Sequence, residues 1–285
     1  MAETRAERTQ EMVQEIRTEY NDIDWPTATR QPLWYGRKNR HLVGDKVGIV
    51  VDYKGEETLA YVASDEYEIV QYEELLWRTT RAMEKLEEYG SPTIDINILQ
   101  DGRKLDMKLT FNECDPVEIR EGQVIQPTID IKSSHDGQWE LGTVAGAVVL
   151  VCTNGLTVGK VAYKNKQKHM TGLTVSGMVE NMKGDMLAFA DETGIWKRWA
   201  DRQLTAPEWA DVQEKIPFGK RQLPEVLALP MDGVGYSISQ SMEGGKLPNL
   251  WEILMSSTQY LRDIDSPIVR MNKTEQISNL LHSYH

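Results

Sequence analysis

The sequence predicts an α+β fold, in which an antiparallel sheet of hairpins with one long packed helix is followed by a helical C-terminal half. Apolar and polar residues alternate strictly on both sides of Asp101-Gly102, from Ile94 to Ile98 and from Leu105 to Phe111. Such alternation is typical of a hairpin with one buried face and one wet face. Apolar residues also recur at helical spacing from Tyr72 to Tyr89 and in several segments of residues 177–285.

Residues 1–45 are expected to form an N-terminal helix and a basic arm. Met12, Ile16 and Tyr20 share one face of a predicted helix over residues 3–20. Trp25-Pro26 ends this helix, because proline disfavours helical backbone at the residue before it. Residues 26–45 are then predicted to be irregular and basic.

Residues 46–176 are expected to form the α+β core. Strands over residues 47–51 and 58–62 flank a turn at Lys54-Gly55, and Gly90 suits the left-handed stop after the long helix. The alternating hairpin follows, and two further strands are expected over residues 128–132 and 145–152.

Residues 177–285 are expected to form a helical region packed on the core. Helical spacing or end signals predict four segments, at residues 177–190, 206–216, 250–261 and 274–284. Thr205 with Glu208 forms a capping box at the start of the second of these segments.

Composition and charge limit the classes of function. The 285 residues carry a net charge of −12, but residues 51–100 hold −8 and residues 151–200 hold +3. An acidic protein with a basic side can still bind nucleic acid there. The sequence lacks an apolar run long enough for a membrane span, and its two cysteines form no paired motif. We therefore expect a cytoplasmic protein with reduced thiols.

Motifs for catalysis or metal binding are weak. The five histidines match no zinc pattern, and no phosphate-binding loop is complete. His135 and Asp136 could suggest a general base, but adjacent residues at a strand end point in opposite directions, so a plain turn is the preferred interpretation. We therefore expect no catalytic residue, no metal and no cofactor.

Two basic segments are candidates for binding nucleic acid. One follows the corner at Asn154-Gly155 and contains Lys160, Lys164, Lys166, Lys168 and His169. The other contains Arg37, Lys38 and Arg40, directly after Trp34 and Tyr35. Cations beside aromatic rings suit a single strand, because the bases stack and the phosphates pair with the cations. A solvated basic face for the first segment, and an arm docked on protein for the second, remain alternatives.

Several motifs follow one another along the chain: the turn Asp101-Gly102-Arg103-Lys104-Leu105, the turn after Ser133-Ser134, the corner Cys152-Thr153-Asn154-Gly155-Leu156 and the helix at Leu250-Trp251. Their order resembles a family of phage- and plasmid-borne proteins catalogued as domain of unknown function 932. The layout of hairpins with one long helix is similar to that of single-strand annealing recombinases, which form rings or helical filaments and hold single strands in a basic groove. That similarity is an analogy of fold.

Taken together, these observations favour a non-catalytic, homo-oligomeric protein that binds and anneals single-stranded DNA. The alternative is a phage-encoded protein-interaction or anti-defence factor, favoured by the acidic net charge of −12. An unrecognised enzyme is the third hypothesis. A membrane partner is not expected.

Overall fold

The computed structural model describes residues 14, 16, 18–36, 40–83, 86, 89–149, 155–156, 165–167, 169, 182–231, 234–264 and 266–284. The chain divides into two compact units, each made of three segments. Unit 1 comprises Met1–Leu109, Asp130–Thr143 and Asn165–Lys183. Unit 2 comprises Thr110–Ile129, Val144–Lys164 and Gly184–His285.

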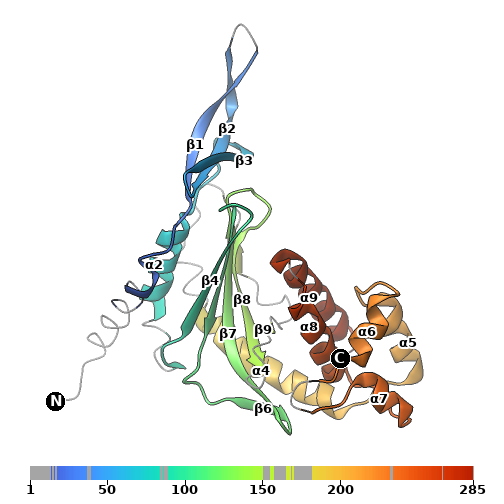
Figure 1. Ribbon diagram of the computed structural model, residues 1–285. Coiled ribbons are helices and arrows are strands. Elements are labelled where there is room, and N and C mark those ends of the chain that lie inside the picture. Colours follow the sequence, from blue (N-terminus) through green and yellow to red (C-terminus); the bar gives the residue numbers. More distant parts are fainter. Residues whose placement is uncertain are drawn as a thin grey trace, which may run out of the picture. The chain divides into compact units, whose positions relative to one another are not determined.

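A three-stranded antiparallel sheet in unit 1 has the order β1-β2-β3, with bounds β1 (Thr27–Tyr35), β2 (His41–Tyr53) and β3 (Glu56–Ser64). Lys54 and Gly55 both have positive φ, which is the backbone that a tight hairpin turn requires. The predicted turn between β2 and β3 is therefore confirmed. Figure 1 shows β1 and β2 as a long twisted hairpin, with β3 beside only part of it.

The expectation that residues 26–45 are irregular is wrong, because β1 and the start of β2 occupy most of them. Pro32 lies within β1 and argues against a strand in the sequence, because proline cannot donate a hydrogen bond to a neighbouring strand. In the structure the pairing is irregular between Pro32 and Trp34, which accommodates the proline. The described residues between 14 and 20 are helical, and the rest of the helix predicted for residues 3–20 lies outside the described residues.

A larger sheet has the strand order β10-β8-β7-β5-β4, with β6 paired to β7 and β9 paired to β8. Asp101 and Gly102 have positive φ, so the predicted turn joins β4 and β5 as expected. The strand expected at residues 128–132 is the middle of a longer β7, and residues 150–152 of the next predicted strand lie outside the described residues. The strands are β4 (Thr93–Leu99), β5 (Lys104–Thr110), β6 (Val117–Arg120), β7 (Gln123–Ser134), β8 (Leu141–Val149), β9 (Gly155–Leu156) and β10 (Asn165–Gln167).

The long helix predicted to follow the first sheet is α2 (Tyr72–Ala82), with 3₁₀ turns at the described residues beyond it. Its predicted apolar stripe, which includes Leu75, Leu76 and Met83, is buried. Gly90 has a φ of 77°, as the predicted left-handed stop requires. The Tyr72 hydroxyl donates to the carbonyl of Arg103 at 2.8 Å, which joins α2 to the strand region of unit 1.

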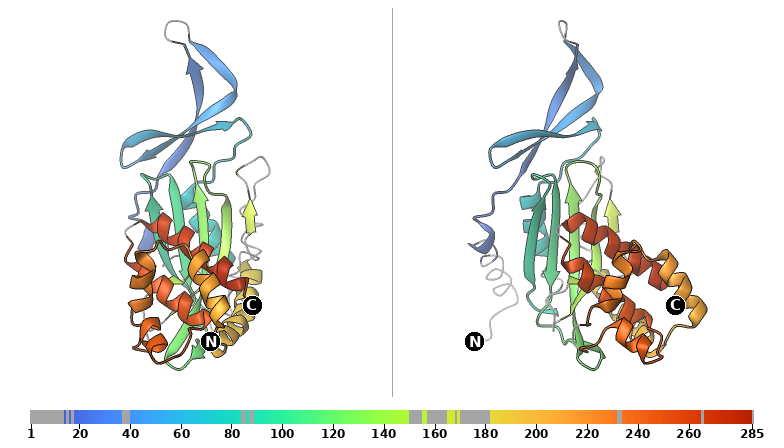
Figure 2. Two further views of the ribbon diagram at one scale, coloured as in Figure 1. Left: turned by 90° about the vertical axis from the view of Figure 1, so that its right-hand side faces the viewer. Right: turned by 45° about the vertical axis from the view of Figure 1, so that its right-hand side comes forward.

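The last segment of unit 2, from Gly184 onward, is mostly helical, and Figure 2 shows its helices in yellow to red. Buried Trp196, Trp251 and Leu254 form the centre of the core of unit 2, with Ile125 and Ala147 contributed by strands. The predicted capping box of Thr205 and Glu208 begins α5, and Ser266 caps α9 earlier than the expected start at residue 274. The helices are α4 (Met182–Asp201), α5 (Ala206–Lys215), α6 (Gln222–Ala228), α7 (Ile238–Glu243), α8 (Leu250–Arg262) and α9 (Pro267–His282).

The α+β class is therefore confirmed, with antiparallel sheets and a helical C-terminal half. Among the helices of the described part of the chain, none is both long and apolar enough to span a bilayer.

Candidate functional site

The outer end of the β1–β2 hairpin exposes aromatic side chains on both faces. Trp34 and Tyr35 are 55% and 61% exposed. Trp34 pairs with Leu42 and Tyr35 with His41, so the two aromatic residues project from opposite faces of the ribbon. The rings of Tyr35 and His41 lie 5.3 Å apart between centroids. Each face of the hairpin end thus presents one exposed aromatic ring.

The same hairpin is basic. Residues 27–46 contain five lysines and arginines and one acidic residue, in a chain with a net charge of −12. Arg40 is exposed, and the guanidinium of Arg30 donates to the carbonyl of Asp65 in the same unit. Arg37 and Lys38 lie outside the described residues. The hairpin end therefore combines exposed rings with a local excess of positive charge.

The second predicted basic segment is only partly described. Lys166 lies on β10, whereas Asn154, Lys160, Lys164 and Lys168 fall outside the described residues. The prediction that these side chains contact nucleic acid stays a prediction.

His169 is buried, with 5% exposure. Its ring stacks on Tyr67 with centroids 5.2 Å apart, and its Nδ1 lies 3.0 Å from the carbonyl oxygen of Glu68. Its Nε2 lies 3.4 Å from the hydroxyl of Ser133. Burial also lowers the pKa of this ring, because desolvation disfavours the imidazolium. His169 therefore packs inside unit 1, and we leave it out of the candidate interface.

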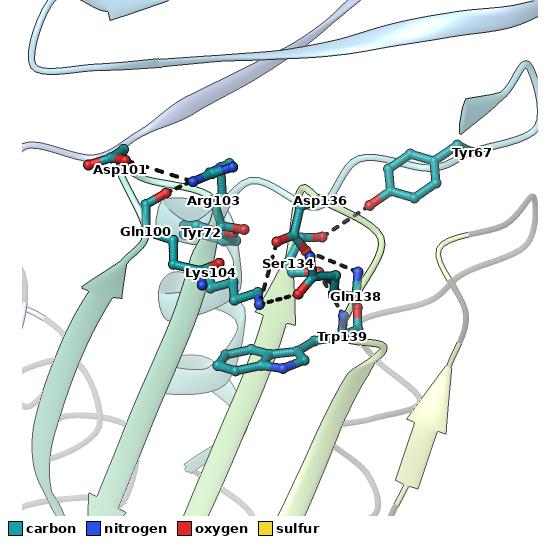
Figure 3. A network of polar contacts seen from close by, with 10 residues as sticks. All are labelled: Tyr67, Tyr72, Gln100, Asp101, Arg103, Lys104, Ser134, Asp136, Gln138 and Trp139. Atoms are coloured by element: carbon teal, nitrogen blue, oxygen red, sulfur yellow. Dashed lines mark hydrogen bonds and ion pairs between the residues drawn. The ribbon is translucent and has the colours of Figure 1, made fainter. Parts of the chain in front are cut away.

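A buried ion pair lies where β5 begins, beside the corner that follows β7 (Figure 3). The ammonium of Lys104 lies 3.5 Å from the carboxylate of Asp136, and both side chains are at most 3% exposed. Lys104 also donates to the amide oxygen of Gln138 at 2.6 Å, and its Nζ lies 4.9 Å from the centroid of the Trp139 ring. The buried cation is thus surrounded by a carboxylate, an amide oxygen and an aromatic face.

Short-range hydrogen bonds shape this corner. The carboxylate of Asp136 accepts a hydrogen bond from the backbone N–H of Gln138 at 3.0 Å. The Ser134 hydroxyl accepts one from the backbone N–H of Trp139 at 2.9 Å. Gly137 has a φ of 69°, and a Cβ there would lie 2.8 Å from the ring of Tyr61. The predicted turn at this position is present, and its Asp136 is also the acidic partner in the buried ion pair.

His135, in the same corner, is fully buried and stacks on Tyr72 with centroids 4.1 Å apart. Within the described residues, neither of its ring nitrogens has a hydrogen-bond partner. Desolvation, with a smaller contribution from His169, lowers the pKa of His135 from its ordinary value of 6.5 to about 3. A ring with this pKa is uncharged at ordinary pH, and it stacks on Tyr72 as a neutral aromatic ring.

The His135 ring makes stability depend on pH. Between pH 6.5 and about 3 the unfolded chain binds a proton that the folded chain does not bind, so acidification destabilises the fold. The contribution is up to about 1.4 kcal/mol per pH unit in that window. We expect His135→Phe, which keeps a ring on Tyr72, to flatten this acid loss in denaturant titrations at several pH values. An unchanged pH slope would contradict this assignment.

Unit 2 contains a polar cavity of about 520 Å³ beside the first turn of α8. The Arg120 guanidinium contacts the Glu252 carboxylate at 3.0 Å and donates to the Tyr236 hydroxyl at 2.9 Å. The same hydroxyl donates to Glu252 at 3.1 Å. Arg120 and Glu252 thus neutralise each other and share the Tyr236 hydroxyl. These contacts link β6 to the start of α8 within unit 2.

No cluster of three or more His, Cys, Asp or Glu side chains suited to a metal ion occurs among the residues that the structure describes.

Residues 60–226 match the model of a family described as a domain of unknown function, DUF932, which is more than half of the chain. The chain belongs to the DUF932 family. Comparison of this chain with curated proteins and with solved structures gives no match. The resemblance noted in the motifs is therefore confirmed.

In this DUF932 protein the buried corner lies inside the matched residues, whereas β1 and β2 precede them. Sequence reasoning singled out the aromatic and basic residues of the hairpin but missed the partner of Asp136. Lys104 stood in the sequence only as part of a turn motif, with no signal that it is buried.

Proposed function

We propose that this protein binds single-stranded nucleic acid, with DNA as the first candidate, through the outer end of the β1–β2 hairpin. The observation that supports the proposal is the pair of exposed rings, Trp34 and Tyr35, within a stretch of five basic residues and one acidic residue. Exposed aromatic rings beside cations are the combination with which single-strand-binding sites stack bases and hold the backbone. Unpaired bases supply a flat apolar partner together with phosphates.

Charge distribution favours a local site over a broad one. The net charge of −12 repels a polyanion from most of the surface, while the hairpin attracts it. A single strand can bend to reach one basic ribbon and leave the acidic surface uncovered. Arg37, Lys38 and Arg40 are the proposed phosphate contacts, and Lys160, Lys164, Lys166 and Lys168 are a second proposed set.

The finer part of the proposal is annealing of complementary strands by an oligomer, in recombination of the kind found in phages and plasmids. Its support is the resemblance of layout to annealing recombinases, which is an analogy. A hairpin that holds a strand by its phosphates and by a few stacked bases leaves the remaining bases able to pair.

The test is fluorescence anisotropy of a labelled oligothymidine across a series of salt concentrations. The logarithm of the affinity should fall with the logarithm of the salt concentration, with a slope of about −2 if only the three hairpin contacts form and about −5 if the four lysines of the second set also contact phosphates. A duplex of the same length should bind more weakly, because its bases are already stacked. Absence of binding at low salt would reject the proposal and favour a protein partner for the acidic surface.

A further inference from the structure

The β1–β2–β3 sheet has one buried face and one uncovered face. Ala28, Ile49, Val51 and Ala63 are all buried and belong to one apolar cluster, which defines the inner face. Because cross-strand partners share a face and neighbours along a strand alternate, the remaining partners define an outer face. The central, uncharged residues of the outer face are Thr29, Gln31, Leu33, Gly48, Val50, Leu59 and Val62.

The outer face is apolar at its centre. Leu59 is 57% exposed and Val62 is 46% exposed. The side chains of Leu59 and Leu33 cover Gly48, since a Cβ at this glycine would lie 3.0 Å from Leu59 and 3.1 Å from Leu33. Most of the strongly exposed large apolar side chains in the described residues lie on these three strands, so the sheet has unusual apolar exposure.

Opposite charges stand at the two ends of this apolar strip. Lys46 is exposed at one end of the outer face on β2. Asp52 and its cross-strand partner Glu57 are exposed at the other end. Lys46 and Asp52 are six residues apart on one strand, which corresponds to about 20 Å. The intervening positions of the outer face carry no charge.

We propose that the outer face binds the outer face of a second copy of this chain in a two-fold dimer. A two-fold axis that runs across the strands reverses their direction in the partner copy. This reversal places Lys46 of one copy over Asp52 and Glu57 of the other, and it does so twice. The two apolar strips then cover each other, as in a sandwich of two sheets.

The dimer contact is separate from the hairpin end in the proposed function, and it does not require nucleic acid. The reversal of the strands points the two hairpin ends in opposite directions. If the proposed function also holds, one dimer presents two single-strand sites.

The test is a charge swap read by light scattering of the full-length chain after size-exclusion chromatography. The wild-type chain should be a dimer in the absence of nucleic acid. Lys46→Glu should weaken dimerisation about tenfold, because the two-fold contact turns two attractions into repulsions. Asp52→Lys with Glu57→Lys in one chain should do the same. All three residues are exposed, so circular dichroism should confirm an unchanged fold.

The decisive experiment mixes the Lys46→Glu variant with the variant that carries Asp52→Lys and Glu57→Lys. In a reversed two-fold dimer, each end of one variant meets an end of opposite charge on the other, so the mixture should recover dimers. A wild-type monomer at all concentrations, or a mixture that stays monomeric, would overturn the dimer. Trp34→Ala should remain dimeric while losing affinity for the oligonucleotide, so the failure of either proposal can be recognised alone.

Discussion

Replacing Trp34 with alanine is expected to weaken binding of a single-stranded oligonucleotide by about 5- to 150-fold, since one stacked base contributes about 1–3 kcal/mol. Trp34 offers a large ring on one face of the β1–β2 hairpin, where it is 55% exposed. Its loss removes a stacking surface and leaves the cations in place. The affinity should therefore fall at every salt concentration, while its salt dependence stays nearly unchanged. Anisotropy titrations at two salt concentrations measure both quantities.

Two matched variants control this prediction. Trp34→Phe should retain part of the affinity, because a smaller ring still stacks. Leu187→Ala removes an apolar side chain of similar exposure, 59%, from α4 and should leave binding unchanged. Equal losses in Trp34→Ala and Leu187→Ala would refute a specific role for the hairpin ring.

Replacing Asp136 with alanine is expected to lower the free energy of unfolding by about 3–5 kcal/mol, because it leaves a buried lysine without its carboxylate. Lys104 would keep the Gln138 amide oxygen and the face of Trp139, but these groups carry no negative charge. Urea unfolding followed by tryptophan fluorescence measures the change.

An exposed ion pair provides the comparison. Lys215 and Asp211 are 2.7 Å apart on the surface of α5, and Lys215→Ala should lower the free energy of unfolding far less than Asp136→Ala does. Lys104→Met combined with Asp136→Ala should recover much of the loss, because both charges leave the interior together. A cost for Asp136→Ala no larger than that of Lys215→Ala would show that the buried pair contributes little.

Local patterns were enough to predict the β2–β3 and β4–β5 hairpins and the helix α2, but not strands β1 and β6. Strict alternation around Asp101-Gly102 specifies both the strands and the turn, and Gly90 marks a helix end by its backbone requirement alone. β1 escaped prediction because Pro32 is a poor strand residue. What stabilises β1 is its pairing with β2, which is a contact between separate segments.

The hairpin end could be recognised from sequence because aromatic and basic residues are adjacent there. The buried corner could not, because Lys104 and Asp136 belong to different strands and meet only through the fold. The interpretation of His169 as part of a basic surface rested on its neighbours in sequence. Its burial against Tyr67 depends on tertiary packing that a local pattern does not encode.

The central claim is that the β1–β2 hairpin holds the single strand, and ultraviolet crosslinking tests it most directly. The full-length protein would be irradiated with a labelled oligothymidine, digested, and the crosslinked peptides identified by mass spectrometry. The account predicts crosslinks at Trp34 or Tyr35, which disappear when unlabelled oligonucleotide is added in excess. Specific crosslinks confined to other parts of the chain would contradict it.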